Sequence, residues 1–551
     1  MIESQTVSLP LEPIFPLAYL RGLPPSLNLD DRRLLVTQMM GMLENFYAHL
    51  PLKQAMLAID PVQAGRLLLD ELTEQQSEVE FLQRLLEIFI RLRDLHTTFA
   101  LPAPYNQLTA FLPFLIEAYF DESHQPRYIV TNVSPQLDLG KLRPGVEVTH
   151  WNGTPMDRKI LELAFTTAGA NPAARCRRAI YTLTTRSLGF DLMPEEDWVT
   201  LTFNDVTGQS ELRYPWLVNM KLPTPEAPVT NSALAAAATL IGHDAQSLEV
   251  QRIRKQMFRP ELIKHEHQIM KRKATAPAAV LRGAVAEETL FPQNLSFRTV
   301  VTPSGQFGCL RIWNFEVTDV DGFVGEIIRI LKLLPQQGII IDVRGNPGGN
   351  ITSGERILQL FTPNRIHPEP VEFRVTDLNR RMADAYQFLE QWRSSLNLSV
   401  RTGSIFSQGF PLTPAEQAND TGQVYPGRAV VIIDAMCYST CCFFAAGFQD
   451  NRIGPIIGVD PTTGAGGANV WTQELLRQLW QPDPNSFLQV LPGGATMSLA
   501  VRRSVRVGAN HGIPLEGLGV SADYIHHLTR NDLLYNNVDL FNYAGQLLAS
   551  S

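Results

Sequence analysis

Cysteine, long apolar runs and surplus positive charge are all scarce in this sequence. The five cysteines among 551 residues are too few for a disulfide scaffold, and no two Cys-x-x-Cys pairs combine into a zinc site. No stretch approaches the roughly 20 apolar residues that a membrane span requires. The 47 basic residues are outnumbered by 55 acidic ones, for a net charge of −8. This balance argues against nucleic acid as a partner.

The first residues also lack the features of a targeting segment. Residues 1–5 have no basic start that leads into an apolar stretch and a small-residue cleavage site. We therefore expect no secretory signal and a cytoplasmic location, in which the cysteines stay reduced. Export by a non-classical route would not require such a signal, so it stays open as an alternative.

What is present is typical of a large globular chain. Apolar residues make up 44% and charged residues 19%, and at roughly 150 residues per domain the length predicts three or four domains. Four regions differ in pattern. They are a helical N-terminal region (1–107), a β-rich module (108–220), an insertion or linker (221–293) and an α/β region (294–551).

The α/β region alternates buried-type strands with apolar or amphipathic helices. Strands are expected at 338–343, 429–433 and 456–458, where the residues are apolar and β-branched, and helices at 324–334 and 440–448. This alternation predicts a mainly parallel sheet covered by helices. In such sheets the reaction centre lies at the carboxyl ends of the strands.

The N-terminal region and the insertion differ sharply in character. Apolar residues recur at helical spacing from about residue 30 to 101, with Asp30 as the expected cap of the first helix. The insertion opens with prolines, is alanine-rich at 231–240, and carries eight basic residues between 252 and 273. It fits a solvated helical face or a regulatory, cleavable segment better than a nucleic-acid contact, because aromatic residues are scarce.

Two loops that follow buried-type strands carry residues suited to catalysis. The first, 342–350, holds three glycines and a proline, so its exposed N–H groups suit an oxyanion or a phosphate. It lacks the Lys-Ser/Thr that closes a phosphate loop. The second loop passes directly into an apolar helix and presents Ser439 at the helix N-terminus, where the dipole favours developing negative charge. From these residues alone, a plain N-cap serine is favoured over a nucleophile.

A serine nucleophile also needs a base and a group that orients the base. His96 follows an apolar helix and stands beside Asp94, where a strand begins. Glu516 lies among glycine and apolar neighbours. Taken singly, the first also fits a boundary histidine and the second a turn acid.

Together these segments resemble the tail-specific, or C-terminal-processing, serine peptidase family. Residues 342–349 resemble its signature strand and loop, 438–450 its nucleophile segment, and 458–467 the glycine-rich loop that follows. Residues 128–155 resemble a PDZ-type peptide-binding module, which stands in the order usual for the family. The resemblance runs from about residue 32 to 532 and leaves the insertion uncovered.

One departure identifies the branch of the family. Many members use a Ser-Lys dyad with the lysine in the glycine-rich loop, whereas 460–467 contains no lysine. The sequence is more similar to the branch of the tricorn core and the chlamydial protease-like activity factor, and closest to the latter, which combines a PDZ-like module with a processed insertion. This resemblance implies Ser439 as nucleophile, His96 as base and Glu516 as orienting carboxylate.

The resemblance also implies a ClpP/crotonase-like catalytic domain, a homodimer, and an oxyanion hole made by the N–H groups of Thr440 and of Gly348 or Gly349. The expected function is a serine endopeptidase that works through an acyl-enzyme on a peptide or protein substrate, without metal or organic cofactor. Two alternatives stay open. One is a catalytically silent peptide- or ligand-binding protein on the same scaffold, and the other is a peptidase whose nucleophile is Cys441 or Cys442.

Overall fold

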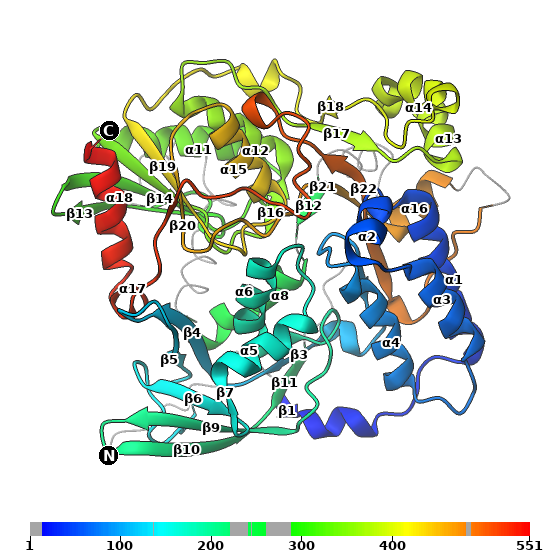
Figure 1. Ribbon diagram of the computed structural model, residues 1–551, viewed down its shortest axis with the longest axis horizontal. Helices are drawn as coiled ribbons and strands as arrows, with labels where there is room; N and C mark the ends of the chain where they lie inside the picture. Colours follow the sequence, from blue (N-terminus) through cyan, green and yellow to red (C-terminus); the bar gives the residue numbers. More distant parts are fainter. Residues whose placement is uncertain are drawn as a thin grey trace, which may run out of the picture.

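The computed structural model describes residues 14–135, 137–220, 241–243, 245–259, 288–480 and 486–550. Over these ranges the chain is a mixed helix and sheet protein of several domains (Figure 1). The alanine-rich stretch and the lysines of the insertion beyond residue 259 lie outside the described residues. None of the helices in the described ranges combines the length and the apolar character needed to cross a bilayer.

Four helices form the N-terminal block. They are α1 (Leu29–Phe46), α2 (Leu50–Leu57), α3 (Pro61–Asp70) and α4 (Glu78–Arg91). The cap of α1 is Asn28 and not the expected Asp30. The Asn28 side chain accepts the backbone N–H of Asp31, and the Asp31 carboxylate accepts the backbone N–H of Asn28, which together form a capping box. The apolar face of α4, which includes Phe81 and Leu85, is buried in the core.

The central sheet is mainly parallel, as the sequence predicts. Its strand order is β13-β14-β15-β19-β20-β23, in which β13 and β14 are antiparallel and every other pair is parallel. The strands are β13 (Leu295–Thr302), β14 (Gly305–Ile312), β15 (Gly338–Asp342), β19 (Arg428–Ile433), β20 (Ile456–Gly458) and β23 (Tyr524–Ile525).

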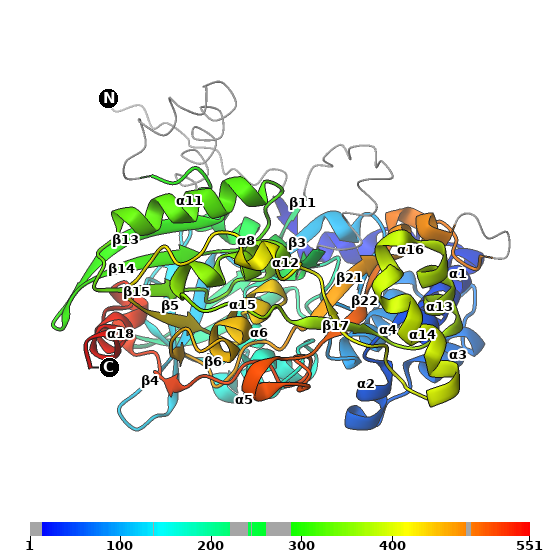
Figure 2. The same ribbon diagram turned by 90° about the horizontal axis from the view of Figure 1, so that it is seen from above.

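Helices cover both faces of this sheet, which explains why its inner strands β15, β19 and β20 consist almost entirely of apolar residues. The covering helices are α11 (Val320–Leu333), α12 (Ile351–Arg356), α15 (Thr440–Asp450), α17 (Arg530–Leu534) and α18 (Val538–Ser550). Ile340 and Ile432 pack with α18, whereas Ile339 and Ile341 belong to the core under α11 and α15. Figure 2 shows α11 and α18 on opposite sides of the sheet. Helix α11 starts four residues before the expected position, because Asp319 caps it.

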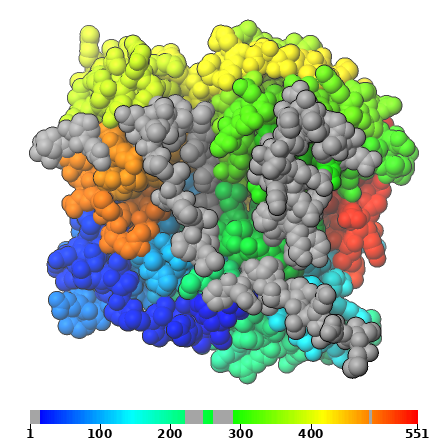
Figure 3. Space-filling view, turned by 180° about the vertical axis from the view of Figure 1, so that it is seen from behind, coloured from blue at the N-terminus to red at the C-terminus, as the bar shows by residue number. Residues whose placement is uncertain are grey.

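A second sheet joins the two ends of the chain. Its order is β18-β17-β22-β2, with β21 also paired to β22. Its strands are β2 (Thr98–Ala100), β17 (Pro370–Phe373), β18 (Phe410–Pro411), β21 (Ala468–Thr472) and β22 (Thr496–Ser504), and α13 (Asp377–Ala385), α14 (Glu390–Thr402) and α16 (Gln473–Trp480) lie nearby. Thr98 pairs with Ser498, and Figure 3 shows the blue N-terminal helices packed against the orange segment that holds β22.

The β-rich module is a six-stranded antiparallel sheet, in which five strands follow the order β10-β9-β6-β5-β4 and β7 pairs with β6. Its elements are β4 (Phe114–Phe120), β5 (Pro126–Val133), β6 (Glu147–Trp151), β7 (Thr154–Pro155), β9 (Trp198–Asp205), β10 (Gly208–Pro215), α5 (Met156–Phe165) and α6 (Pro172–Thr182). A smaller sheet consists of β1 (Ile14–Pro16), β11 (Leu217–Met220), β3 (Leu108–Phe111) and β8 (Thr185–Ser187). The boundaries between the four expected regions stay predictions.

The insertion contributes two described elements, β12 (Ile241–His243) and α8 (Ala245–Phe258). Strand β12 pairs antiparallel with β16 (Gly348–Asn350), in the loop after β15. Arg254 of α8 faces protein, since its guanidinium lies 3.8 Å from the ring centroid of Tyr181. Short 3-10 helices complete the chain at Leu17–Gly22, Tyr105–Gln107, Leu358–Phe361, Gln387–Leu389, Gln417–Asn419, Pro492–Gly494 and Gly508–Asn510.

Candidate active site

Ser439 lies between β19 and α15, at the carboxyl end of the parallel sheet. Its backbone has φ 55° and ψ −125°, a left-handed conformation that is unusual for any residue except glycine. The side chain makes no capping hydrogen bond, so the plain N-cap interpretation does not hold. Among the described residues, Oγ of Ser439 has no hydrogen-bond partner although the residue is fully buried. A buried, unengaged hydroxyl on a strained turn is typical of a nucleophile.

The glycine-rich loop after β20 packs directly on this turn. A Cβ atom on Gly466 would lie 2.6 Å from two ring carbons of Tyr438 and 2.7 Å from the backbone nitrogen of Ser439. Gly464 is equally confined, by the carbonyl oxygens of Ala435 and Cys437. The glycines therefore allow close packing against Ser439.

The loop after β15 contacts both neighbours of Ser439. The N–H of Tyr438 donates to the carbonyl of Asn346 over 3.0 Å, and Oγ1 of Thr440 donates to the carbonyl of Gly349 over 2.8 Å. The N–H of Gly348 donates to Oδ1 of Asn346 over 2.9 Å. This loop thus brings backbone N–H groups beside the N-terminus of α15, but the side chain of Asn346 already engages one of them.

His96 sits in a buried turn between α4 and β2 that is organised by Asp94. The Asp94 carboxylate accepts the backbone N–H of His96 (2.8 Å) and the hydroxyls of Thr97 (3.0 Å), Tyr47 (2.8 Å) and Tyr438 (3.4 Å). The His96 and Tyr438 rings are 4.6 Å apart between centroids. Since Tyr438 directly precedes Ser439, these contacts bring His96 beside the nucleophile segment.

Asp94 stays ionised in this setting. Burial alone would raise its pKa, but the neighbouring His49, Lys53 and His96 side chains and the N–H of His96 lower the pKa to about 2. A carboxylate that already accepts four hydrogen bonds has little capacity for another role. Asp94 therefore fixes the shape of the turn that presents His96.

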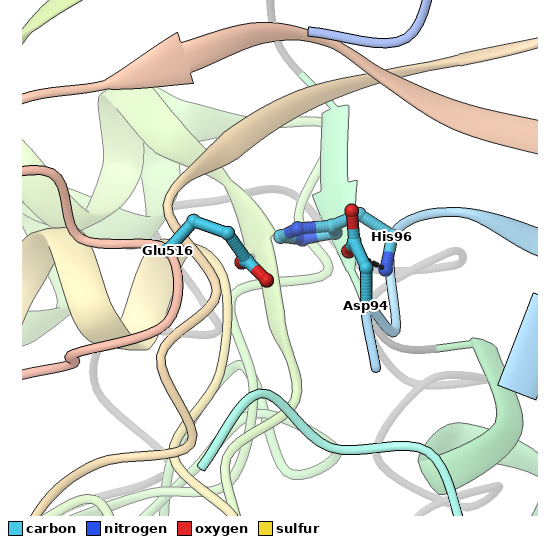
Figure 4. Close-up of side chains that lie close together, drawn as sticks. All are labelled: Asp94, His96 and Glu516. Atoms are coloured by element: carbon cyan, nitrogen blue, oxygen red, sulfur yellow. Dashed lines mark hydrogen bonds between the residues drawn. The ribbon is translucent and has the colours of Figure 1, made fainter. Parts of the chain in front are cut away.

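Glu516 reaches the same point from the loop between β22 and β23. Its carboxylate and the His96 ring point toward one another (Figure 4), and one oxygen of Glu516, one of Asp94 and one ring nitrogen of His96 all lie within 4.8 Å of one another. Oε1 accepts Nζ of Lys53 over 2.6 Å. Burial raises the pKa of Glu516 to about 8, while the Lys53 ammonium acts to lower it and Asp94 to raise it.

The same three side chains are a poor cation site. The four donors on Asp94 occupy its oxygens, and the Lys53 ammonium already neutralises Glu516. A bound cation would have to displace these contacts and approach a positive charge. The arrangement instead suits a histidine that gains a proton, because carboxylates surround it.

The sequence comparison identifies the domain around this site. Residues 306–486 match the family model described as peptidase family S41. The chain carries a peptidase family S41 domain. The S41 domain is that of a serine-type peptidase, as the sequence predicts.

Two solved structures of CPAF share the fold of most of the chain. Mature CPAF matches with a TM-score of 0.64 and 17% identity, over 94% of this chain and 98% of that chain. CPAF in complex with lactacystin matches with a TM-score of 0.63 and 18% identity, over 95% and 99%. A photosystem II D1 C-terminal processing protease also matches, with a TM-score of only 0.36 and 11% identity, over 92% and 94%. The comparison with curated proteins found no significant relative.

These findings bear on the predictions unequally. The family and the α/β fold of the catalytic region are confirmed, and nothing supports a catalytically silent binding protein. The roles of Ser439, His96 and Glu516, and of Thr440, Gly348 and Gly349 in an oxyanion hole, stay predictions. The homodimer and the PDZ-like nature of the β-rich module are likewise untested.

The geometry disfavours a cysteine nucleophile in the S41 domain. Cys441 and Cys442 are fully buried inside α15. Burial raises the pKa of Cys441, and it raises the pKa of Cys442 to about 12, so both thiols stay protonated. A thiol in this state is a poor nucleophile.

Sequence reasoning missed two residues of the site. Lys53 stands in an apolar helix without any motif, and its partner Glu516 is 463 residues away, so no local signal points to the pair. Tyr438 could have been singled out, because it directly precedes Ser439. Its hydroxyl accepts the N–H of Leu95 over 3.1 Å, which ties the nucleophile segment to the turn of His96.

Proposed function

We propose that the chain is a serine endopeptidase that uses Ser439, His96 and Glu516 as a catalytic triad. The observation that carries the proposal is the convergence of three distant segments on one buried point. Ser439 has an unengaged hydroxyl on a strained turn, Tyr438 beside it contacts the His96 ring, and the Glu516 carboxylate faces that ring. The S41 domain supplies the matching reaction class.

In the proposed reaction His96 takes the proton of Ser439 while Oγ attacks the peptide carbonyl. Glu516 holds the ring and stabilises the imidazolium that forms, and His96 then returns the proton to the leaving amine. Water hydrolyses the acyl-enzyme by the same route in reverse. These steps need no metal or organic cofactor.

For the oxyanion hole we favour the N–H groups of Thr440 and Gly349. Thr440 is the first residue of α15, where the helix dipole favours negative charge. Gly348 is the weaker candidate, because its N–H already donates to Asn346. One such donor is worth roughly 3 kcal/mol of barrier.

The substrate is proposed to bind as an added strand along β16, the position that β12 occupies here. Gly242 of the insertion pairs with Gly349, directly beside the proposed oxyanion hole. The edge strand β4 of the β-rich module offers a second place for one end of a peptide.

It follows that the insertion 221–293 would occlude the site until it is cut or displaced. In this state Ser439, His96 and Glu516 are each no more than 1% exposed. Mass spectrometry of ageing protein should reveal cleavage within 221–293 in parallel with a gain of activity. Full activity of an uncut chain would contradict this regulatory role.

The decisive test of the function is covalent labelling with a fluorophosphonate, followed by peptide mapping. The label should map to Ser439 in the cut protein, should be lost in Ser439→Ala and should persist in the control Ser521→Ala, which alters an exposed serine. Peptide binding without labelling of Ser439, in both the intact and the cut chain, would overturn the proposal in favour of a silent binding protein.

A further inference from the structure

Lys53 connects the two segments that carry the proposed base and its orienting carboxylate. Its Nζ donates to Oε1 of Glu516 over 2.6 Å and to the carbonyl of Arg93 over 3.1 Å. Arg93 belongs to the turn that ends in His96, and it has a positive φ of 51°. One ammonium group on α2 thus holds the Glu516 loop and the His96 turn at a fixed separation.

This contact is buried on both sides. The side chains of Lys53 and Glu516 are 4% and 0% exposed, so water does not screen the pair. Lys53 engages one oxygen of Glu516, and the other, Oε2, has no partner among the described residues. The carboxylate as a whole faces the His96 ring (Figure 4). Lys53 therefore sets the direction in which Glu516 presents its remaining oxygen.

The charge of Lys53 matters as much as its position. Burial raises the pKa of Glu516 most, Asp94 also raises it, and Lys53 is the group in the described structure that lowers it, so that the net pKa is about 8. The nearby Tyr47 and His49 bring no positive charge. Burial raises the pKa of Tyr47, and it lowers the pKa of His49 to about 3, so both are neutral at pH 7.

We infer that Lys53 is a positioning residue that turns Glu516 toward His96 and favours its ionised form. The inference rests on the proposed triad and extends it by one member from α2. Lys53 acts on His96 only through the Glu516 carboxylate. The ionised form matters because a protonated Glu516 would neither orient the correct tautomer of His96 nor stabilise its imidazolium.

The first test is the pH dependence of kcat in Lys53→Met, which keeps the length of the side chain and removes its charge. Turnover at pH 7 should fall by on the order of tenfold for each unit by which the pKa of Glu516 rises. It should recover as the pH is raised, while KM stays unchanged. Lys53→Arg should restore part of the loss, and the control Lys332→Met, on the exposed surface of α11, should match the unaltered enzyme.

A double variant separates this role from mere structural support. In the Glu516→Gln background, adding Lys53→Met should change kcat less than twofold, because the group through which Lys53 acts is gone. This pair also replaces the buried ion pair by neutral groups, so it should fold even if Lys53→Met alone does not. A full additional loss of kcat in the double variant would overturn the inference.

An activity-independent readout separates failure of the inference from failure of the proposed function. The infrared difference spectrum between each protein and its Glu516→Gln counterpart reports the ionisation of Glu516 at pH 9, one unit above its pKa of about 8 in the unaltered chain. A carboxylate band in the unaltered chain and a carboxylic acid band in Lys53→Met are expected. The same band in the unaltered chain and in Lys53→Met would overturn the inference, even if Ser439 is labelled normally. A missing label on Ser439 would instead contradict the proposed function and not the effect of Lys53 on Glu516.

Discussion

Replacing Gly466 by alanine should damage the nucleophile turn without touching any catalytic group. The added Cβ would lie 2.6 Å from the Tyr438 ring and 2.7 Å from the nitrogen of Ser439, whereas ordinary contacts begin near 3.4 Å. Neither neighbour can withdraw freely. The Tyr438 hydroxyl is held by Asp94 and Leu95, and the Ser439 nitrogen is main chain.

The size of the effect follows from this overlap of nearly 1 Å. Overpacking of a tight core costs roughly 1–3 kcal/mol of unfolding free energy. A displacement of about 1 Å at a reacting atom costs roughly a hundredfold in rate. Gly466 has no positive φ, so an alanine backbone fits there and the clash is the sole source of the effect.

The assay compares Gly466→Ala with Gly325→Ala. Gly325 lies in α11, and its added Cβ would meet nothing within 4 Å, so this control should gain about 0.5–1 kcal/mol of stability from its helical position. Chemical denaturation gives the stability, and the rate of fluorophosphonate labelling of cut protein reports the geometry of Ser439. Equal labelling rates and equal midpoints in the two variants would refute the view that the glycine-rich loop supports the nucleophile by close packing.

Three further changes probe the site and its surroundings. Asp94→Asn should lower the unfolding free energy at pH 7 by about 2 kcal/mol. The depressed pKa of Asp94 stabilises the fold above pH 4, and this gain is lost as the pH falls through about 2. An unchanged denaturation midpoint at pH 7 would contradict this prediction. Burial raises the pKa of Glu355 to about 7, so stability that is present below pH 4.5 is lost as the pH rises through 7. Glu355→Gln should therefore recover roughly 3 kcal/mol of unfolding free energy at pH 8 but little at pH 4. Parallel curves of stability against pH for the two proteins would exclude this effect. Ser439→Gly should be more stable than Ser439→Ala by about 1 kcal/mol, because glycine adopts the φ of 55° without strain. Neither variant should react with the fluorophosphonate. Equal denaturation midpoints of the two variants would show that the turn is unstrained.

Local pattern was enough to predict the central sheet. Its inner strands β15, β19 and β20 are almost entirely apolar because helices cover both faces. The loop after β15 is rich in glycine, and the loop after β19 places Ser439 at a strand-to-helix junction. These features depend on residues close together in the chain. The cap of α1 was misplaced by two residues, since the choice between Asn28 and Asp30 depends on one side-chain hydrogen bond.

Long-range pairing was beyond local pattern. His96 and Glu516 could be connected with Ser439 only through the family resemblance, because nothing in their own surroundings distinguishes them from a boundary histidine and a turn acid. Lys53 had no such support. The three residues of β12 are too few to carry a periodic signal, so the pairing of the insertion with β16 was not predictable.

The pairing of β2 with β22 also sets the moment at which the active site can exist during synthesis. The hydrogen bond between Thr97 and Ala500 joins residues 403 apart, and at roughly 5–20 residues per second the ribosome needs about 20–80 s to make the chain between them. Throughout this interval the nascent chain has its histidine turn but no partner strand to hold it. Because Glu516 lies further along the chain than β22, the proposed site cannot assemble before both β22 and Glu516 have been made.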